Sequence, residues 1–260
     1  MIDIHSHILY GIDDGAKTLE DSEAIIKSAI KNKVSAIFLT PHYILESKFM
    51  TPNNEKKDIL QALEKKFSDK IKLYLGNEIY INNEIEELIK KGEIHPLGDS
   101  NYLLVELPVY NEYPDLEKYL FHLQDSGYKV IIAHPERYFY FKNDIKKVIE
   151  LCEQGIYFQG NYMSLYNIYS RSTRKLFIKL LMHHCYTFMA SDIHSPHQKY
   201  YSKIKDAEEK VRQVVGKKYT DDIFFNNAAK IISGEEIKIE FKEKISIFDR
   251  IRGNIWERSY

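Results

Sequence analysis

The chain has 260 residues, 44% of them hydrophobic, and its 37 Lys and Arg residues nearly balance its 38 Asp and Glu residues. This is enough apolar material for a large core, and the balanced charge, with no long block of one sign, argues against a nucleic-acid-binding or membrane-surface protein. No apolar run approaches the roughly 20 residues of a membrane span, and no secretory leader is recognisable. We therefore expect a cytoplasmic protein without membrane insertion.

Short apolar runs typical of buried strands alternate with amphipathic helical patterns along most of the chain. The strand-like runs are 2–4, 36–39, 73–75, 103–107, 130–133, 157–159 and 186–190. Helices are expected at 23–33, 56–67, 83–91, 116–126, 144–154, 172–183 and 203–215. Thr18 and Asp21 resemble a capping box before the first helix, and Thr51 followed by Pro52 predicts an N-cap with proline at the first position of the second. No proline-rich or glycine-rich linker intervenes, so we predict one α/β domain over 1–260, with 235–260 as an appended tail.

Histidines and carboxylates stand at the C-terminal ends of six of these seven runs. They are His5 and His7 with Asp13 and Asp14 in the loop beyond, His42, Glu78, Glu106, His134 followed by Arg137, and Asp192 with His194. Only the sixth run lacks them, and we interpret its Gln159 and Asn161 as ordinary polar strand-end residues. Because buried strands are apolar, metal-ligand residues that recur at the same end of six strands indicate a shared metal cluster.

The sharing of one cluster constrains the fold. Neighbouring strands are about 4.8 Å apart, so six strands of an open sheet would spread their ligands over more than about 20 Å. In a closed barrel of parallel strands, all C-terminal ends face one mouth. We therefore predict a TIM-like barrel of seven strands rather than a doubly wound sheet.

These motifs carry a family resemblance. DIHSH, LTPHY, GNEIY, VELP, AHPERY and SDIH are similar, in order and spacing, to the motifs of the PHP (polymerase and histidinol phosphatase) superfamily. Together with the DDG loop, they resemble the bacterial manganese-dependent protein-tyrosine phosphatases of capsule and exopolysaccharide operons. The resemblance runs from the start of the chain to about residue 232, where NNAAKII looks like the family's closing helix.

The resemblance implies a distorted (β/α)7 barrel with three divalent ions at its mouth, most often Mn²⁺. The implied metal ligands are His5, His7, Asp14, His42, Glu78, Glu106, His134, Asp192 and His194. Imidazole and carboxylate ligands without thiolate suit Mn²⁺, and also Fe or Zn²⁺. Arg137 is implied to hold the phosphate, and with Asp14 it forms the expected catalytic pair. Lys199 stands where the family commonly has a second arginine, and we expect it to bind substrate with a single charge rather than a bidentate fork.

The implied activity is hydrolysis of phosphotyrosine by a metal-activated hydroxide, with no protein nucleophile. The expected substrate is a phosphotyrosine protein, in particular an autophosphorylating bacterial tyrosine kinase that controls capsule or exopolysaccharide synthesis. The aromatic run at 138–141 could stack a phosphotyrosine ring, or equally form a partly buried cluster beside the mouth.

This function has three alternatives. A thiol-based tyrosine phosphatase needs an arginine six residues after its cysteine, but Ser191 follows Cys185 at that spacing. Cys152 and Cys185 instead suggest reduced core thiols. A small-molecule phosphomonoesterase such as histidinol phosphatase would use the same metals, so the ligands do not separate it from a tyrosine phosphatase. A non-catalytic scaffold typically lacks ligands, and none is missing here.

Overall fold

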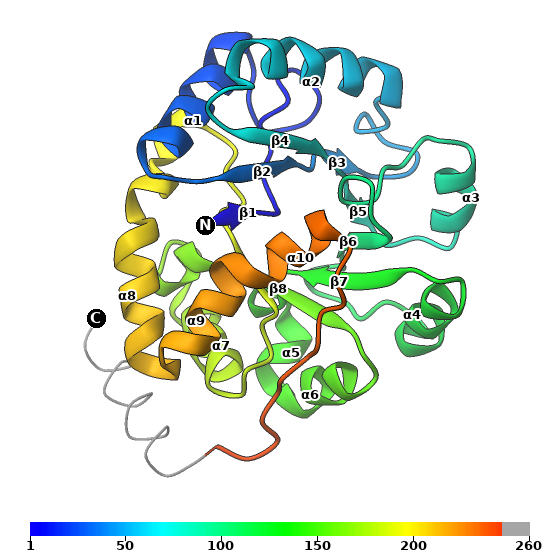
Figure 1. The fold of residues 1–260 in the computed structure, drawn as a ribbon. Coiled ribbons are helices and arrows are strands. Elements are labelled where there is room, and N and C mark those ends of the chain that lie inside the picture. Colours follow the sequence, from blue (N-terminus) through cyan, green and yellow to red (C-terminus); the bar gives the residue numbers. More distant parts are fainter. Residues whose placement is uncertain (246–260) are drawn as a thin grey trace.

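Nine short strands form the centre of the molecule in the computed structural model, which describes residues 1–245 (Figure 1). They are β1 (Ile2–Asp3), β2 (Ala36–Leu39), β3 (His42–Tyr43), β4 (Lys72–Leu75), β5 (Glu78–Tyr80), β6 (Tyr102–Glu106), β7 (Lys129–Ala133), β8 (Tyr157–Asn161) and β9 (Phe188–Ala190). All seven predicted runs are strands. The additional β3 and β5 begin three residues after β2 and β4 end, so each extends a predicted strand past a two-residue break.

Every strand pairing is parallel, as the predicted barrel requires. One set has the order β1-β2-β4, and the other has the order β3-β5-β6-β7-β8-β9. Because β3 and β5 continue the chain of β2 and β4, the two sets are parts of one curved sheet. A bridge between Ser6 and Ile193 then joins the segment after β9 to the segment after β1. This bridge brings the last strand end beside the first, so all strand ends face one mouth.

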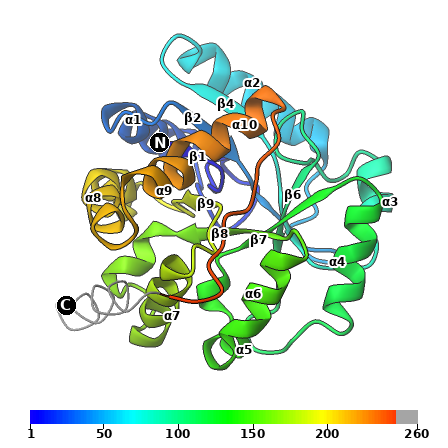
Figure 2. The ribbon, with the colours of Figure 1, turned by 60° about the horizontal axis from the view of Figure 1, so that its bottom comes forward.

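Helices surround this sheet, as Figures 1 and 2 show. The main ones are α1 (Leu19–Lys31), α2 (Asn53–Phe67), α3 (Ile85–Lys90), α4 (Leu116–Asp125), α6 (Ile145–Glu153), α7 (Arg171–Met182) and α8 (Ile204–Val215), and α5 (Phe139–Asn143) and α9 (Lys217–Asp221) are shorter. The α1 capping box of Thr18 and Asp21 is confirmed. The predicted N-cap of α2, Thr51, was one position early. Pro52 is the N-cap and makes no side-chain capping hydrogen bond.

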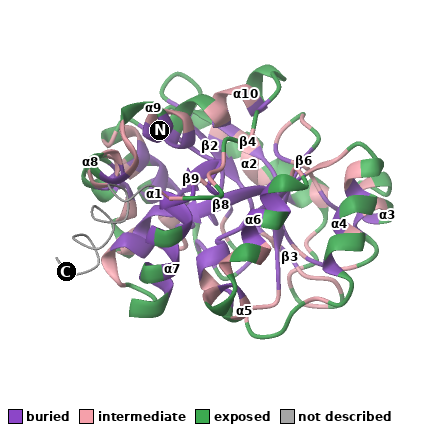
Figure 3. Ribbon diagram, turned by 90° about the horizontal axis from the view of Figure 1, so that it is seen from below, coloured by how far each residue is buried: buried purple, intermediate pink, exposed green. Residues whose placement is uncertain are grey.

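A hydrophobic cluster fills the inside of the sheet, and α10 (Asn227–Ser233) closes it at the N-terminal ends of the strands. Ile4, Phe38 and Ile131 pack in this cluster with Ala228 and Ile231 of α10. Figure 2 shows α10 crossing this end of the strands, and Figure 3 shows that the strands are largely buried. The predicted closing helix is therefore present, and the opposite end of the strands carries the polar residues.

Residues 235–245, the described part of the predicted tail, run back across the end of the barrel that α10 closes. Ile237 is buried in the inner cluster, and its carbonyl accepts a hydrogen bond from the Tyr157 hydroxyl at 3.1 Å. Further on, the Lys242 amide donates to the carbonyl of His183 at 2.7 Å. The remainder of that predicted tail, residues 246–260, lies outside the described residues. None of the helices within 1–245 has the length and apolar character needed to cross a membrane.

Candidate metal centre

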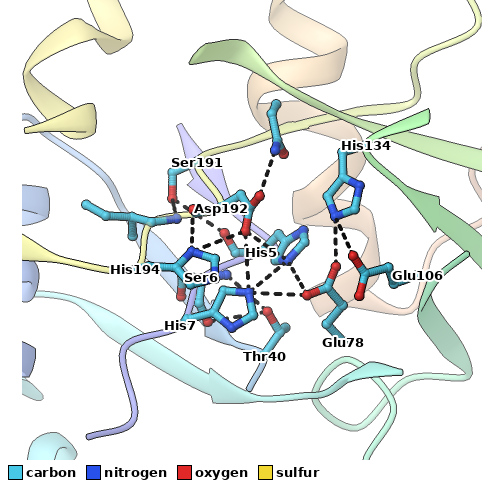
Figure 4. Close-up of polar contacts among 12 residues, drawn as sticks. His5, Ser6, His7, Thr40, Glu78, Glu106, His134, Ser191, Asp192 and His194 are labelled. Atoms are coloured by element: carbon cyan, nitrogen blue, oxygen red, sulfur yellow. Dashed lines mark hydrogen bonds and ion pairs between the residues drawn. The ribbon is translucent and has the colours of Figure 1, made fainter. Parts of the chain in front are cut away.

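The nine predicted ligand residues meet at the open mouth of the barrel. His5 and His7 follow β1, and Asp14 lies in the loop beyond them. The remaining six lie in or directly after later strands: His42 in β3, Glu78 in β5, Glu106 in β6, His134 after β7, and Asp192 and His194 after β9. Figure 4 shows seven of these side chains pointing toward one another from different strands.

Their donor atoms form four overlapping groups. The groups are His7, Asp14, His42 and His194; His5, His134 and Asp192; His5, His7 and Glu78; and His42, Glu78 and Glu106, and within each the donor atoms lie within 4.8 Å of one another. The union of the groups is the full set of nine predicted ligands. A separation above about 10 Å among His5, His134 and Asp192 would have excluded a common metal site, and the structure brings them within that reach.

Glu78 is the hub of the cluster. Its Oε2 atom lies 3.2 Å from His5 Nε2, 3.3 Å from His7 Nε2 and 3.0 Å from His42 Nδ1, and its Oε1 atom lies 2.9 Å from His134 Nε2. Glu78 and His5 are fully buried, whereas the side chain of Asp14 is 56% exposed. The cluster therefore extends from a buried floor to a solvent-facing rim.

The loop after His7 is shaped by Asp13 and Gly15. Asp13 accepts a hydrogen bond from His7 Nδ1 at 2.6 Å and another from the His42 amide at 3.0 Å, so it orients two predicted ligands. A Cβ atom on Gly15 would lie 2.2 Å from the His7 carbonyl oxygen. Only glycine fits so close to another backbone, so Gly15 allows the loop to fold onto His7.

Two of the predicted ligands have left-handed backbones. His134 has φ 31° and Asp192 has φ 54°, each directly after a strand or one residue later. This region costs a non-glycine residue roughly 1–2 kcal/mol. Such strain is commonly stored at functional sites, and here it lies at two positions of the candidate metal centre.

The ionisable groups of the cluster perturb one another strongly. Burial opposes the charged form of His5, but Glu78 and Asp192 outweigh it and raise its pKa to about 9. Burial and Arg137 lower the pKa of His134 to about 4, whereas burial and the charge of Glu78 raise the pKa of Glu106 to about 7. Buried carboxylates and imidazoles with such shifted pKa values are typical of functional sites.

The donor set fits divalent cations. Three buried polar atoms of the cluster, His42 Nδ1, Glu78 Oε2 and His134 Nδ1, have no well-aligned hydrogen bond within residues 1–245, although the first two lie 3.0 Å apart. Buried polar atoms nearly always have a partner, and an ion is one such partner. Imidazole nitrogens and carboxylate oxygens without thiolate are the donors that Mn²⁺, Fe and Zn²⁺ take in catalytic sites.

Replacement of Asp13 by asparagine tests its orienting role. An amide is a weaker acceptor for the Nδ1 hydrogen of His7, so we expect metal affinity to fall by about 10- to 100-fold. Metal retained against increasing chelator, counted by elemental analysis, measures the loss. Asp144→Asn, at the N-cap of α6, is the matched control and should retain metal like the wild type. Equal retention by both variants would contradict the role of Asp13.

Arg137 lies at the rim of the cluster. Its Nη1 group donates to Asp192 Oδ2 at 3.1 Å, its side chain is 30% exposed, and its guanidinium carbon lies 5.2 Å from the centre of the Tyr169 ring. Lys199 is exposed, and no hydrogen bond or ion pair among residues 1–245 joins its side chain to the cluster. The substrate-binding role of Lys199 therefore stays a prediction.

The aromatic run at 138–141 is divided between the core and the surface. Tyr138 and Phe141 are fully buried, and the Tyr138 hydroxyl accepts a hydrogen bond from the Leu107 amide at 2.9 Å. Phe139 is 54% exposed. Two of these rings are thus core residues, and Tyr169 is the aromatic ring that lies beside Arg137.

Four residues at or beside the cluster were not assigned a role from the sequence. Asp13, Gln159 and Asn161 hydrogen-bond to predicted ligands, and Tyr169 lies beside Arg137. Gln159 and Asn161, interpreted from the sequence as ordinary polar strand-end residues, hydrogen-bond to His5 and Asp192. Their position at the end of the sixth of the seven predicted strands was a usable signal, because the ends of the other six contribute to the cluster.

Together, the fold and the site define a parallel α/β barrel whose mouth carries a candidate polynuclear metal centre. The chain belongs to the family described as capsular polysaccharide synthesis, CpsB/CapC, which residues 1–233 match.

Curated relatives of this chain are named tyrosine phosphatases. It is 37% identical to the putative tyrosine-protein phosphatase CapC of Staphylococcus aureus over 75% of this chain and 77% of that protein. It is 30% identical to the tyrosine-protein phosphatase CpsB of Streptococcus pneumoniae over 91% of this chain and 100% of that protein.

Solved structures agree on the fold. A structure from the pair YwqE of Bacillus subtilis and CpsB of S. pneumoniae, described as unique metal-dependent tyrosine phosphatases, superposes with a TM-score of 0.82 and 26% identity, covering 95% of this chain and 100% of that one. The histidinol phosphate phosphatase of Lactococcus lactis superposes with a TM-score of 0.54 at 17% identity over 81% of this chain and 93% of that one, which shows a shared fold alone.

Proposed function

We propose that this protein is a metal-dependent protein-tyrosine phosphatase that acts in capsular or exopolysaccharide synthesis. The observation that carries the proposal is the convergence of nine imidazole and carboxylate side chains at the barrel mouth. Membership of the CpsB/CapC family, whose curated members are named tyrosine phosphatases, supports it.

We propose that the centre holds three divalent ions, with Mn²⁺ as the expected metal. Nine ligands shared among three ions are about three each, which leaves coordination positions open to phosphate and water. When bound, the ions supply an activated water and neutralise charge on the phosphate oxygens.

Arg137 is the protein group placed to bind the phosphate. One of its nitrogen atoms donates to Asp192, and a guanidinium has five N–H donors, so donors remain for an anion at the exposed rim. The contact with Asp192 also holds the guanidinium in place before substrate arrives. This arrangement favours a phosphate clamped between Arg137 and the metal centre.

The chemistry of the substrate favours an aryl phosphate. A tyrosine side chain has a pKa of about 10, so its oxygen leaves far more readily than the alkoxide of serine. The ring of Tyr169 beside Arg137 offers an aromatic face near the phosphate position. We propose an autophosphorylating bacterial tyrosine kinase as the protein substrate.

A side-by-side assay tests this function. Phosphate release is measured from a phosphotyrosine peptide, the matching phosphoserine peptide and histidinol phosphate, with Mn²⁺ added to chelator-stripped protein. We expect the phosphotyrosine peptide to be cleaved with the highest kcat/KM. Preference for histidinol phosphate would replace the proposal with a small-molecule phosphatase, and equal rates would contradict tyrosine specificity.

The cysteines are not expected to take part in catalysis. Cys152 and Cys185 are buried, and the hydrogen-bonding partner Cys152, together with burial, raises the pKa of the Cys185 thiol well above its usual value. A thiol in such surroundings is not a ready nucleophile. Cys152→Ala and Cys185→Ala should therefore keep wild-type kcat with the phosphotyrosine peptide. A loss of turnover with metals still bound would point to thiol chemistry.

A further inference from the structure

Of the seven strand ends that face the mouth within residues 1–245, that of β8 contributes no histidine or carboxylate to the cluster. This end instead carries Gln159 and Asn161, which are fully buried and, two residues apart, point to the same side. Parallel pairing places Gln159 opposite Ala133 and Asn161 opposite Ala190, next to the strand ends that lead to His134 and Asp192. Buried amides need partners, and these two find them in the cluster.

The two amides form a continuous chain of hydrogen bonds between two predicted ligands. His5 Nδ1 lies 2.8 Å from Gln159 Oε1, Gln159 Nε2 lies 2.8 Å from Asn161 Oδ1, and Asn161 Nδ2 lies 2.7 Å from Asp192 Oδ2. His5 comes from the first strand end and Asp192 from the last. The chain therefore connects the two sides of the seam where the barrel closes.

The chemistry of Asp192 sets the direction of every bond in this chain. An ionised carboxylate can only accept, so the amide nitrogen of Asn161 must face it. The oxygen of Asn161 then faces Gln159, which must donate with its nitrogen and present its oxygen to His5. It follows that His5 carries a hydrogen on Nδ1, so Nε2, the atom that faces Glu78 and Asp192, is the ring nitrogen available to a metal ion.

The same contacts select one oxygen of Asp192. Its Oδ2 atom accepts from both Asn161 and Arg137, at 2.7 and 3.1 Å. Its Oδ1 atom is left facing the ring nitrogens of His5 and His7, at 3.5 and 3.4 Å. The two side-chain amides thus determine which nitrogen of His5 and which oxygen of Asp192 face the cluster.

Contacts with Glu136 and Tyr186 fix the C-terminal end of β8 in place. The buried carboxyl group of Glu136 accepts a hydrogen bond from the backbone N–H of Asn161 at 2.9 Å and another from the Tyr186 hydroxyl at 3.0 Å. A Cβ atom on Gly160 would lie 2.7 Å from the ring of Tyr186, so only glycine allows the ring to lie against the strand. These contacts restrict the movement of both amides.

We propose, on the basis of the proposed metal-dependent function, that Gln159 and Asn161 form an amide relay that positions His5 and Asp192 for metal binding. The relay holds His5 with a hydrogen on Nδ1 and Nε2 available to a metal ion, and turns Oδ1 of Asp192 toward the cluster. Both amides are positioning residues, because they act through the ligands and not on the substrate.

Substitutions of Gln159 test the relay without using activity. Gln159→Met keeps the length of the side chain but removes the acceptor for His5, and should lower metal affinity by about 10- to 100-fold. Gln159→Glu restores that acceptor but cannot donate to Asn161 Oδ1, so it should recover only part of the lost affinity. Gln124→Met is the matched control, since Gln124 on α4 donates to the Gln154 carbonyl far along the chain from any ligand. Metal retained in a chelator titration, counted by elemental analysis, is the readout.

Wild-type affinity in Gln159→Met, or an equal loss in the Met and Glu variants, would overturn the relay. A second measurement needs no variant and decides the question even if Gln159→Met fails to fold. In wild-type protein loaded with Zn²⁺, long-range ¹⁵N–¹H correlation spectra report the His5 tautomer. We expect the hydrogen on Nδ1, and a hydrogen on Nε2 would overturn the relay.

The outcomes separate the relay from the proposed function. A wild-type protein that retains metals but leaves phosphotyrosine intact would contradict the function, while the metal retention of the variants would still decide the relay. Conversely, a protein that cleaves phosphotyrosine and whose Gln159 variants all retain metal normally would contradict the relay alone.

Discussion

Glu78→Gln is expected to remove almost all phosphatase activity. Glu78 belongs to two of the four donor groups and lies within 3.3 Å of four histidine ring nitrogens, so it contacts a large part of the centre. Its loss leaves those nitrogens without their shared carboxylate and weakens binding of more than one ion. Metal centres supply several kcal/mol of transition-state stabilisation, so we expect kcat to fall by on the order of 10³ or more.

The measurement is kcat with a phosphotyrosine peptide, together with the metal count of the same sample. Glu23→Gln is the matched control, because Glu23 is also a largely buried carboxylate but pairs with lysines on helices α1 and α2. It should keep wild-type kcat. Undiminished turnover by Glu78→Gln would show that the cluster is not the catalytic centre.

Arg137→Ala is expected to keep full metal content and lose substrate turnover. A charge-assisted clamp on phosphate is worth several kcal/mol in a site shielded from water, so kcat/KM should fall by on the order of 10² or more. Arg137→Lys should recover only part of the loss, since one ammonium cannot replace the guanidinium fork. Steady-state kinetics and elemental analysis on the same preparations separate this effect from loss of metal.

Lys199→Ala belongs in the same series, because the sequence predicts that Lys199 binds substrate whereas the structure shows no hydrogen bond or ion pair between its side chain and the cluster within residues 1–245. A loss of kcat/KM comparable to that of Arg137→Ala would place the lysine in substrate binding.

Unchanged kinetics of Arg137→Ala would remove the arginine from the mechanism.

The strands and the strand-end positions of the candidate ligands could be predicted from the sequence because both depend on local pattern, whereas the ligand set itself was implied by the family resemblance. Each predicted ligand follows an apolar run, and parallel strands in a barrel expose these ends at one mouth. The breaks after β2 and β4 could not be predicted, because they arise where a strand changes its neighbours. His42 and Glu78 lie in the short strands β3 and β5 beyond these breaks.

The residues that orient the ligands were harder to predict. Gln159 and Asn161 are uncharged amides, which are common at strand ends for many reasons. Only the register of β8 with β7 and β9, a long-range property, places them against His5 and Asp192. Tyr169 lies in a loop and meets Arg137 across 32 positions of sequence, so no local pattern marks it.

A titration that follows bound metal and turnover together tests whether the reaction depends on the metal centre at the barrel mouth. Protein stripped by chelator is titrated with Mn²⁺, and bound metal per chain is determined at each point beside phosphate release from a phosphotyrosine peptide. We expect no turnover in stripped protein and full turnover as the count approaches three. Full turnover by protein that carries no metal would contradict the proposed mechanism.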